Sequence, residues 1–283
     1  MAACERLELL RISANQLKGL PDWLLRLPRL TWLAHGGNPF SARHEAAALA
    51  QAALPQVPWG TLDVQALLGE GASGHIYRAA QPSEALAALK VFKGEVTSDG
   101  LPSTELAACL QAGSHPVLIP ALGRLAEHPA GADGLLMPLM GPEFRPLAGP
   151  PSYVSCTRDV YAPGLQLTVG MARTIAADVA GALAHLHAHG LTHGDLYAHN
   201  LLHDGQGHVR LGDFGAASFL ASVPPEQARQ LQALEVRALG CLLEELQALC
   251  ADDAGALTPL AEACLQADVA ARPNALAVAQ ELV

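Results

Sequence analysis

The chain has 283 residues, of which 51% are apolar and 16% are charged, so it can form a sizeable core in one or two domains. Its formal net charge of −10 argues against a general nucleic-acid-binding protein. No apolar run approaches the roughly 18 residues that a membrane span needs, and the N-terminus MAACERLELLR lacks a signal-peptide pattern. Six cysteines without CxxC spacing indicate free thiols, so we expect a cytoplasmic protein.

Leucines, prolines and asparagines recur along residues 7–40, with Asn15 and Asn38 lying 23 residues apart. This pattern resembles a leucine-rich repeat, and it predicts a partial α/β solenoid segment over residues 1–40. In that fold a short strand would point Leu10 and Ile12 into the core, and a concave face could bind a protein partner. Fewer than two repeats are visible, whereas about three are usually needed for stability. The alternative, a single amphipathic helix, is disfavoured by the two prolines.

An alanine-rich run, SARHEAAALAQAA, follows at residues 41–53 and predicts a helix with Ser41 as its N-cap. Pro55 and Pro58 would end this helix. We therefore expect a helical linker over residues 41–60.

Glycines then occur in a G-x-G-x-x-G pattern at Gly69, Gly71 and Gly74. Alone the pattern is weak, because dinucleotide-binding turns share it, but in those turns a helix follows the glycines. Here the glycines lie between two strand-like runs, 64–68 and 75–80. This favours a glycine-rich hairpin that folds over phosphates.

A single lysine, Lys90, interrupts the apolar strand predicted over residues 87–92. A buried ammonium is costly unless it is paired. Glu105 lies 15 residues further on, in a helix predicted over residues 103–111. We expect the two to pair and to aim the ammonium at bound phosphates, although a lone Lys or Glu is more often a surface charge.

A long helix is predicted over residues 169–189, because apolar residues recur at helical spacing and Gly190 suits its C-terminal end. His185 and His189 lie four residues apart on this helix and suggest a metal site. No third ligand with matching spacing follows, so surface histidines are the preferred interpretation.

The stretch LTHGDLYAHNLLHDGQGHVRLGDFG, residues 191–215, holds Asp195, Asn200 and Asp213 in order. Its glycine-rich centre predicts a turn between two short strands. Such a hairpin would bring Asn200 beside Asp213, where an amide and a carboxylate could share Mg²⁺. The alternative is a surface hairpin with ordinary solvated acids.

These motifs, in this order, resemble the eukaryotic-type protein kinases from about residue 61 to residue 280. The resemblance implies an α+β, two-lobed protein kinase fold, with the small lobe and hinge at 61–141 and the large lobe at 142–283. It implies that Lys90, fixed by Glu105, holds the phosphates. It also implies that Asp195 is the catalytic aspartate, which orients the acceptor hydroxyl and accepts its proton, and that Asn200 and Asp213 bind Mg²⁺. It further implies that His193 packs on Phe214.

The resemblance also implies ATP as the nucleotide. Met137 would lie at the back of the adenine pocket, Leu139 and Met140 would offer backbone groups to adenine, and Ala88 and Leu202 would pack on its two faces. The full implied nucleotide-binding set is Leu68, Gly69, Gly71, Gly74, Ile76, Ala88, Lys90, Met137, Leu139, Met140 and Leu202.

The chain departs from this family inside the catalytic stretch. Gly194 replaces the usual Arg before the catalytic Asp, and Tyr197 and His199 stand where basic side chains are usual. The missing Arg and a short segment after Gly215 predict a kinase that is not activated by phosphorylation of that segment. His199, if protonated, could supply part of the missing positive charge.

Three further features of the C-terminal part resemble the family. Pro225-Glu226 resembles the end of the activation segment. The central helix of the large lobe is expected to start near Leu234, with Glu235 where Asp is usual. Arg272 is expected to form a buried ion pair with Glu226.

The leading hypothesis is transfer of the γ-phosphate of ATP to a protein Ser or Thr hydroxyl, with Tyr left open. One alternative is a pseudokinase scaffold that only binds partners through the repeats and the kinase fold. Another is a small-molecule kinase of the same fold, because His-Gly-Asp also occurs there.

Overall fold

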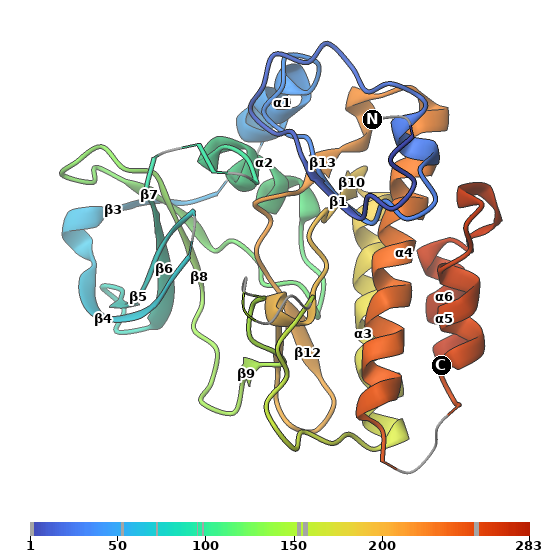
Figure 1. Cartoon of the computed structure of the whole chain (residues 1–283). Helices are drawn as coiled ribbons and strands as arrows, with labels where there is room; N and C mark the ends of the chain where they lie inside the picture. Colours follow the sequence, from blue (N-terminus) through green and yellow to red (C-terminus); the bar gives the residue numbers. More distant parts are fainter. Residues whose placement is uncertain are drawn as a thin grey trace.

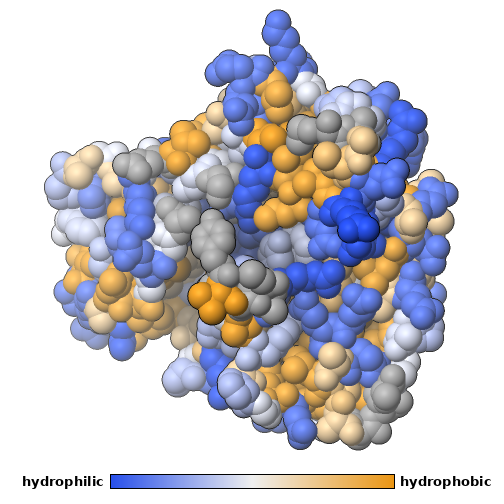
Figure 2. All heavy atoms as spheres, viewed as in Figure 1, coloured by the Kyte–Doolittle hydropathy of each residue, from blue (hydrophilic) through white to orange (hydrophobic). Residues whose placement is uncertain are grey.

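The computed structural model describes residues 3–51, 54–71, 73–94, 96–97, 99–151, 154, 158–251 and 255–283. The protein has mixed α/β content in two lobes (Figure 1). The smaller lobe holds a twisted sheet, and the larger lobe holds the long helices. Hydrophobic and hydrophilic residues are interspersed over the face drawn in Figure 2.

The sheet of the smaller lobe has six strands in the order β3-β7-β8-β6-β5-β4. β3 pairs with β7 in parallel, and the remaining neighbours are antiparallel. β3 lies inside the stretch expected to be a helical linker. β4, β5 and β6 match the runs predicted from the sequence, whereas β7 was not predicted. The bounds are β3 Gln56–Pro58, β4 Asp63–Glu70, β5 Gly74–Ala80, β6 Leu86–Phe92, β7 Gly123–Ala126 and β8 Gly134–Pro138. A short 3-10 turn, η2 (Trp59–Thr61), links β3 to β4.

Two helices pack together beside this sheet, α1 (Ala42–Gln51) and α2 (Pro102–Ala112). Both were predicted from the sequence to within two residues. Ser41 does not make the side-chain hydrogen bond predicted for the N-cap of α1. The Ser41 hydroxyl donates to the carboxylate of Glu45 and to the carbonyl of Asn38 instead of accepting a backbone N–H. The Glu45 carboxylate also accepts the hydroxyl of Thr104 on α2 at 3.1 Å, which joins the two helices.

The larger lobe is built around α3 (Val169–Ala188) and α4 (Pro225–Leu249), with α5 (Thr258–Cys264) and α6 (Ala275–Leu282) packed on them. The apolar stripe predicted for α3 is buried, since Ile175, Val179 and Leu183 are all 0% exposed. Gly190 adopts φ +74° just after the helix, as its predicted C-terminal position requires. Among the described residues, no helix combines the length and apolar character needed to cross a membrane.

The predicted catalytic stretch forms the expected loop and hairpin between the lobes. β11 (Leu201–His203) pairs antiparallel with β12 (Val209–Leu211), and β9 (Arg145–Pro146) adds a third strand. β10 (Leu191–Thr192) pairs with β13 (Ser218–Phe219), so the two ends of the stretch are tied together. Two 3-10 turns, η3 (Ala198–Asn200) and η4 (Leu220–Ser222), complete it.

The N-terminal segment, residues 3–41, forms two short parallel strands that lie against the larger lobe, beside α2 and the upper end of α4 (dark blue in Figure 1). β1 (Leu9–Arg11) pairs with β2 (Trp32–Ala34), and η1 (Leu24–Arg26) lies between them. Buried leucines of this segment share one apolar core with α4 and with the turn η5 (Val269–Ala271), namely Leu20, Leu24, Leu25, Leu27, Leu30 and Leu33.

One predicted helix boundary is wrong. The central helix α4 begins at Pro225, nine residues before the predicted start at Leu234. Pro225 occupies the first helical turn, where proline is well tolerated because the N–H there has no helical partner. The Pro225-Glu226 pair therefore opens the helix instead of ending the preceding segment.

Candidate active site

Lys90, Glu105 and Asp213 form a cluster of charges between the lobes. Lys90 on β6 and Glu105 on α2 are buried and form the predicted ion pair, and the Lys90 ammonium lies 3.9 Å from an Asp213 carboxylate oxygen. Burial alone would lower the pKa of Lys90, but the attraction of Glu105 and Asp213 outweighs it and raises the pKa. The ammonium is therefore charged at neutral pH.

Asp213 is the half-exposed member of this cluster and has backbone φ +58°, an uncommon conformation for a non-glycine residue. Desolvation acts to raise its pKa, but the Lys90 ammonium and a hydrogen bond from the Gly215 N–H lower it overall. The carboxylate is thus ionised and accessible. Strained backbone of this kind often occurs at functional sites.

The glycine-rich turn joins β4 to β5 beside this cluster. Gly71 N–H donates to the Gly74 carbonyl at 2.9 Å, and the Lys93 ammonium bonds the Gly71 carbonyl at 3.0 Å. A Cβ at position 74 would lie 2.6 Å from the Val91 carbonyl oxygen, so this position requires glycine. Gly69 and Gly71 have open space around them, as a turn that covers a ligand needs.

The apolar residues predicted to bind adenine lie on strands of both lobes. Ala88 on β6 lies opposite Met137 on β8, and Ile76 on β5 lies opposite Lys90. Leu202 lies on β11 in the larger lobe. Leu68 lies inside β4, just before the glycine-rich turn, and Leu139 and Met140 follow β8.

Asn200 connects the two ends of the catalytic stretch. Its amide nitrogen donates to the Asp195 carbonyl at 2.8 Å and to the Asp195 carboxylate at 3.1 Å. Its backbone carbonyl accepts the Gly212 N–H, next to Asp213. The two bonds to Asp195 use the amide nitrogen of Asn200, so they do not occupy its amide oxygen. Asn200 and Asp213 therefore offer the oxygen donors that suit Mg²⁺.

His193 packs on Phe214 as predicted, with ring centroids 5.4 Å apart. Its Nε2 lies 2.9 Å from the Gly212 carbonyl, and its Nδ1 accepts the Asp195 N–H at 3.3 Å. A carbonyl can only accept, so the proton is on Nε2. These bonds fix the backbone at Asp195 and next to Asp213.

Glu235 on α4 also holds this backbone. Its carboxylate accepts the Gly194 N–H at 2.8 Å, and its second oxygen lies 2.8 Å from His187 Nε2. Gly194 has φ +78°, and a Cβ there would lie 2.4 Å from the Ala216 carbonyl oxygen. An arginine is therefore excluded at this position by the backbone itself.

His199 does not extend toward a phosphate. Its Nδ1 lies 2.6 Å from the carboxylate of Asp159, which also accepts the backbone N–H groups of Ala198 and His199. Asp159 lies just before the isolated bridge between Gly149 and Val160, and no sequence motif marked it.

Tyr197, the other departure from the family, stacks on Trp32 of the N-terminal segment, with ring centroids 4.3 Å apart and planes at 10°. Trp32 Nε1 donates to the Leu196 carbonyl at 2.8 Å. Burial raises the pKa of the Tyr197 hydroxyl, so it stays protonated. A groove of about 730 Å³ lies beside these rings and is lined in part by Trp32, Tyr197 and Asp159.

Arg11, at the end of β1, is a site residue that the sequence did not reveal. Its Nη2 donates to Asp195 Oδ1 at 2.8 Å, and its Nη1 forms an ion pair with Asp99. Arg11 and Asp195 are 184 residues apart. Only the tertiary structure brings them together.

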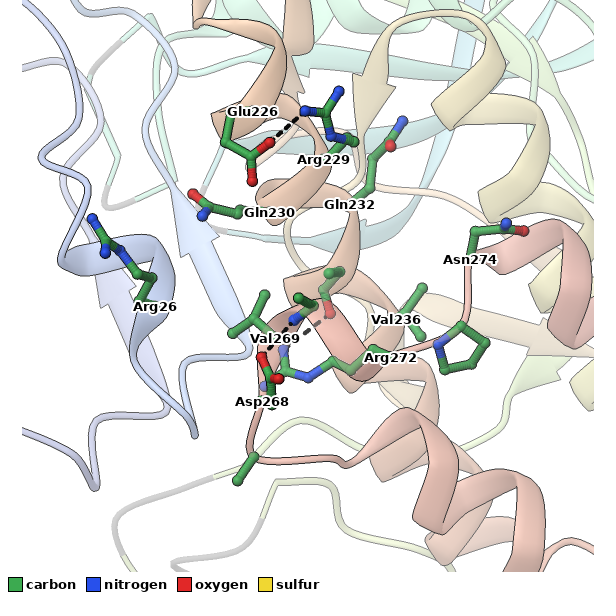
Figure 3. Close-up of a pocket in the computed structure, with 14 residues that line it drawn as sticks. Arg26, Glu226, Arg229, Gln230, Gln232, Val236, Asp268, Val269, Arg272 and Asn274 are labelled. Carbon is green, nitrogen blue, oxygen red and sulfur yellow. Dashed lines mark hydrogen bonds and ion pairs between the residues drawn. The ribbon is translucent and has the colours of Figure 1, made fainter.

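The predicted ion pair between Arg272 and Glu226 is wrong. Arg272 donates to three backbone carbonyls, those of Gln266, Ala233 and Pro28, at 2.9–3.0 Å. Glu226 instead pairs with Arg229 on the helix surface (Figure 3). The pocket drawn there lies between η1, α4 and η5, and none of the predicted site residues lines it.

The His185 and His189 rings lie in contact, with centroids 4.0 Å apart and planes at 31°, and both bond backbone carbonyls. Across the described ranges, no cluster of three or more His, Cys, Asp or Glu side chains could hold a metal ion.

Comparison with known proteins points to one family. Residues 62–236 match the family model described as "Protein kinase domain". The DNA damage-responsive serine/threonine-protein kinase RqkA of Deinococcus radiodurans is 33% identical over 178 residues, which cover 61% of this chain and 24% of that protein. The serine/threonine-protein kinase TOS3 of Saccharomyces cerevisiae is 39% identical over 75 residues, 26% of this chain and 13% of that protein. These alignments thus span a quarter or less of each relative's length.

Proposed function

Because the chain belongs to the protein kinase domain family, we propose that it transfers the γ-phosphoryl group of ATP to a Ser or Thr hydroxyl of a protein. The observation that carries the proposal is that Lys90 on β6 and Glu105 on α2 meet Asp213 of the stretch 191–215. The same stretch holds Asp195, whose carboxylate accepts from the Asn200 amide. The names of the relatives support Ser and Thr as acceptors.

In the proposed reaction, the acceptor oxygen forms a bond to the γ-phosphorus while the bond to the β,γ-bridging oxygen breaks, and ADP leaves. Asp195 orients the hydroxyl and takes its proton. Lys90, held by Glu105, and the N–H groups of the glycine-rich turn hold the phosphates. Asn200 and Asp213 would bind Mg²⁺, which neutralises charge on the phosphates when bound. Positioning and electrostatic stabilisation account for most catalysis of this kind.

The proposed nucleotide contacts are those named from the sequence. Ala88 and Leu202 would sandwich adenine, Met137 would close the back of its pocket, and backbone groups near Leu139 and Met140 would bond it. Leu68 and Ile76 flank the glycine-rich turn and would cover the ribose and phosphates.

Radiolabel transfer from ATP to a mixed protein lysate tests the proposal, with Lys90→Met and Asp213→Asn as variants. Both changes remove a charge from the cluster, and we expect transfer to fall at least about 100-fold in each. Thermal unfolding and binding of an ATP analogue provide the controls for folding. Full activity of Asp213→Asn would refute the assignment, and a wild-type protein without transfer would leave a partner-binding scaffold as the better description.

The N-terminal segment is proposed to be a partial leucine-rich repeat unit. In support, β1 and β2 are parallel and pair Leu9 with Trp32, which matches the 23-residue period of the sequence. The Asn38 amide donates to the carbonyls of Ile12 and His35, and its oxygen accepts the Leu17 N–H. A protein partner on this segment stays a prediction from the repeat pattern.

We also propose the domain limits predicted from the sequence, with the repeat segment at 1–40, the linker predicted to be helical at 41–60, the small lobe and hinge at 61–141 and the large lobe at 142–283. The end of that linker, β3, joins the sheet of the small lobe. A cytoplasmic location is proposed on the basis of free thiols at Cys4, Cys109, Cys241 and Cys264. Cell fractionation would test the location.

A further inference from the structure

The catalytic stretch supplies no cation to Asp195. Between Leu191 and Asn200 the sequence contains no Lys or Arg. The two histidines there are already engaged, His193 with the Gly212 carbonyl and His199 with the Asp159 carboxylate. The Asp195 carboxylate, which in the proposed reaction lies close to the triphosphate of ATP, therefore receives no positive charge from its own segment.

Arg11 brings a cation to this point from a fixed backbone. Its strand pairs with β2, where Arg11 lies opposite Ala34, and the next residue donates its N–H to the Ala34 carbonyl at 2.8 Å. The guanidinium joins Asp195 to Asp99, which lies in the loop before α2. Its side chain is only 23% exposed, and that of Asp195 is 13% exposed. Charge-assisted hydrogen bonds of this kind are strong and directional.

The Asp195 carboxylate is held at both oxygens. Oδ1 accepts from Arg11 at 2.8 Å, and Oδ2 accepts from the Asn200 amide at 3.1 Å. Two such bonds from opposite sides fix the rotation of the carboxylate. An ionised carboxylate has about four acceptor sites, so a site remains for the acceptor hydroxyl.

The segment that carries Arg11 is a built-in part of the larger lobe. Trp32 is 3% exposed and bonds Leu196, next to Asp195. The Gln227 amide donates to the Leu20 carbonyl, and Arg272 donates to that of Pro28. Detaching the segment would expose this apolar core, which favours a permanent contribution to the site over a removable inhibitor.

We propose that Arg11 is a positioning residue of the active site, which orients the Asp195 carboxylate and offsets the negative charge that Asp99, Asp195 and Asp213 bring to the cleft. This inference rests on the proposed kinase function. The N-terminal segment thereby supplies the cation that Gly194 and Tyr197 do not.

The test compares Arg11→Ala and Arg11→Lys with Arg26→Ala, which removes an exposed arginine of the same segment whose partner is Asp22. We expect kcat to fall about 10- to 100-fold in Arg11→Ala, as for other lost orienting groups, with KM for ATP within about twofold of wild type. Arg11→Lys should recover part of the loss. Millimolar guanidinium should raise the rate of Arg11→Ala and leave wild type and Arg26→Ala unchanged.

Three results would overturn the proposal. Wild-type or higher kcat in Arg11→Ala would show that the contact is neutral or inhibitory. Equal losses in Arg11→Ala and Arg11→Lys, together with a lower melting temperature and weaker binding of an ATP analogue, would show a structural role. A loss that guanidinium and lysine both fail to restore in a stable, nucleotide-binding variant would also contradict orientation of Asp195. Absence of transfer by the wild-type chain would refute the proposed function itself, whatever Arg11 does.

Discussion

Replacement of Gly194 by alanine is a direct test of how the backbone shapes the catalytic stretch. Gly194 has φ +78°, and its Cβ would meet the Ala216 carbonyl oxygen at 2.4 Å and the Leu33 carbonyl oxygen at 3.3 Å. The left-handed conformation costs alanine about 1–2 kcal/mol. Displacing packed backbone adds about 1–3 kcal/mol. We expect Gly194→Ala to lower the free energy of unfolding by about 2–5 kcal/mol in total.

Gly190→Ala is the matched control for this change. Gly190 has nearly the same conformation, φ +74°, but nothing lies within 4 Å of its added Cβ. Gly190→Ala should therefore lower the free energy of unfolding only by the cost of the left-handed conformation, about 1–2 kcal/mol. Gly181 lies inside α3 with open space around it and no positive φ. Because alanine has a higher helix propensity than glycine, Gly181→Ala should raise the free energy of unfolding by about 0.5–1 kcal/mol. Urea unfolding followed by circular dichroism measures all three, and equal losses at positions 190 and 194 would refute the argument.

Three other predictions follow from the structure. Ser218→Ala with Ser222→Ala should keep most kinase activity, because Ser218 is 1% exposed and the segment is held by pairing of β13 with β10; a near-complete loss would contradict this. Burial lowers the pKa of His35 from 6.5 to about 4, so the unfolded chain takes up the proton at a higher pH than the folded chain does. The free energy of unfolding should therefore fall by roughly 3 kcal/mol as the pH drops from 6.5 to 4. His35→Leu should flatten that pH dependence in urea titrations, and an unchanged slope would exclude His35 as its source. Arg272→Ala should lower the free energy of unfolding by about 2–4 kcal/mol, because three carbonyls lose their hydrogen-bond donor. Glu226→Ala should change it by less than about 0.5 kcal/mol, because its pair with Arg229 lies on the surface. Equal effects of the two changes would support the ion pair between Arg272 and Glu226 after all.

The parts of the fold that the sequence predicted are those governed by local patterns. Apolar residues at helical spacing predicted α3, because such a stripe must be buried. Glycines between two strand-like runs predicted the β4–β5 hairpin, and the Asp-Gly-Gln-Gly run predicted the turn between β11 and β12. In the site, Lys90 and Glu105 were predicted to pair because each has a recognisable place in an element.

The errors arise where distant parts of the chain decide the outcome. The start of α4 was misplaced because Pro225 was interpreted as the end of a loop, although proline is equally suited to a first helical turn. Arg272 was assigned the wrong partner, because the groups that it bonds are backbone carbonyls, which every residue carries and no sequence motif marks. The N-terminal segment shows fewer than two repeats in the sequence, and only the structure reveals that its leucines complete the core around α4.

The N-terminal segment lies against two of the residues that make the catalytic stretch unusual. At position 194 the positive φ and the Ala216 carbonyl oxygen, 2.4 Å from an added Cβ, require glycine, and the Leu33 carbonyl oxygen of β2 lies 3.3 Å from the same point. Position 197 holds a tyrosine whose ring stacks on Trp32, and a lysine would lose that contact. Both substitutions remove a cation, and Arg11 on the neighbouring strand reaches Asp195. The missing charges and the contacts of the N-terminal segment therefore occur at the same place, and the proposed site includes Arg11 of that segment together with the catalytic stretch.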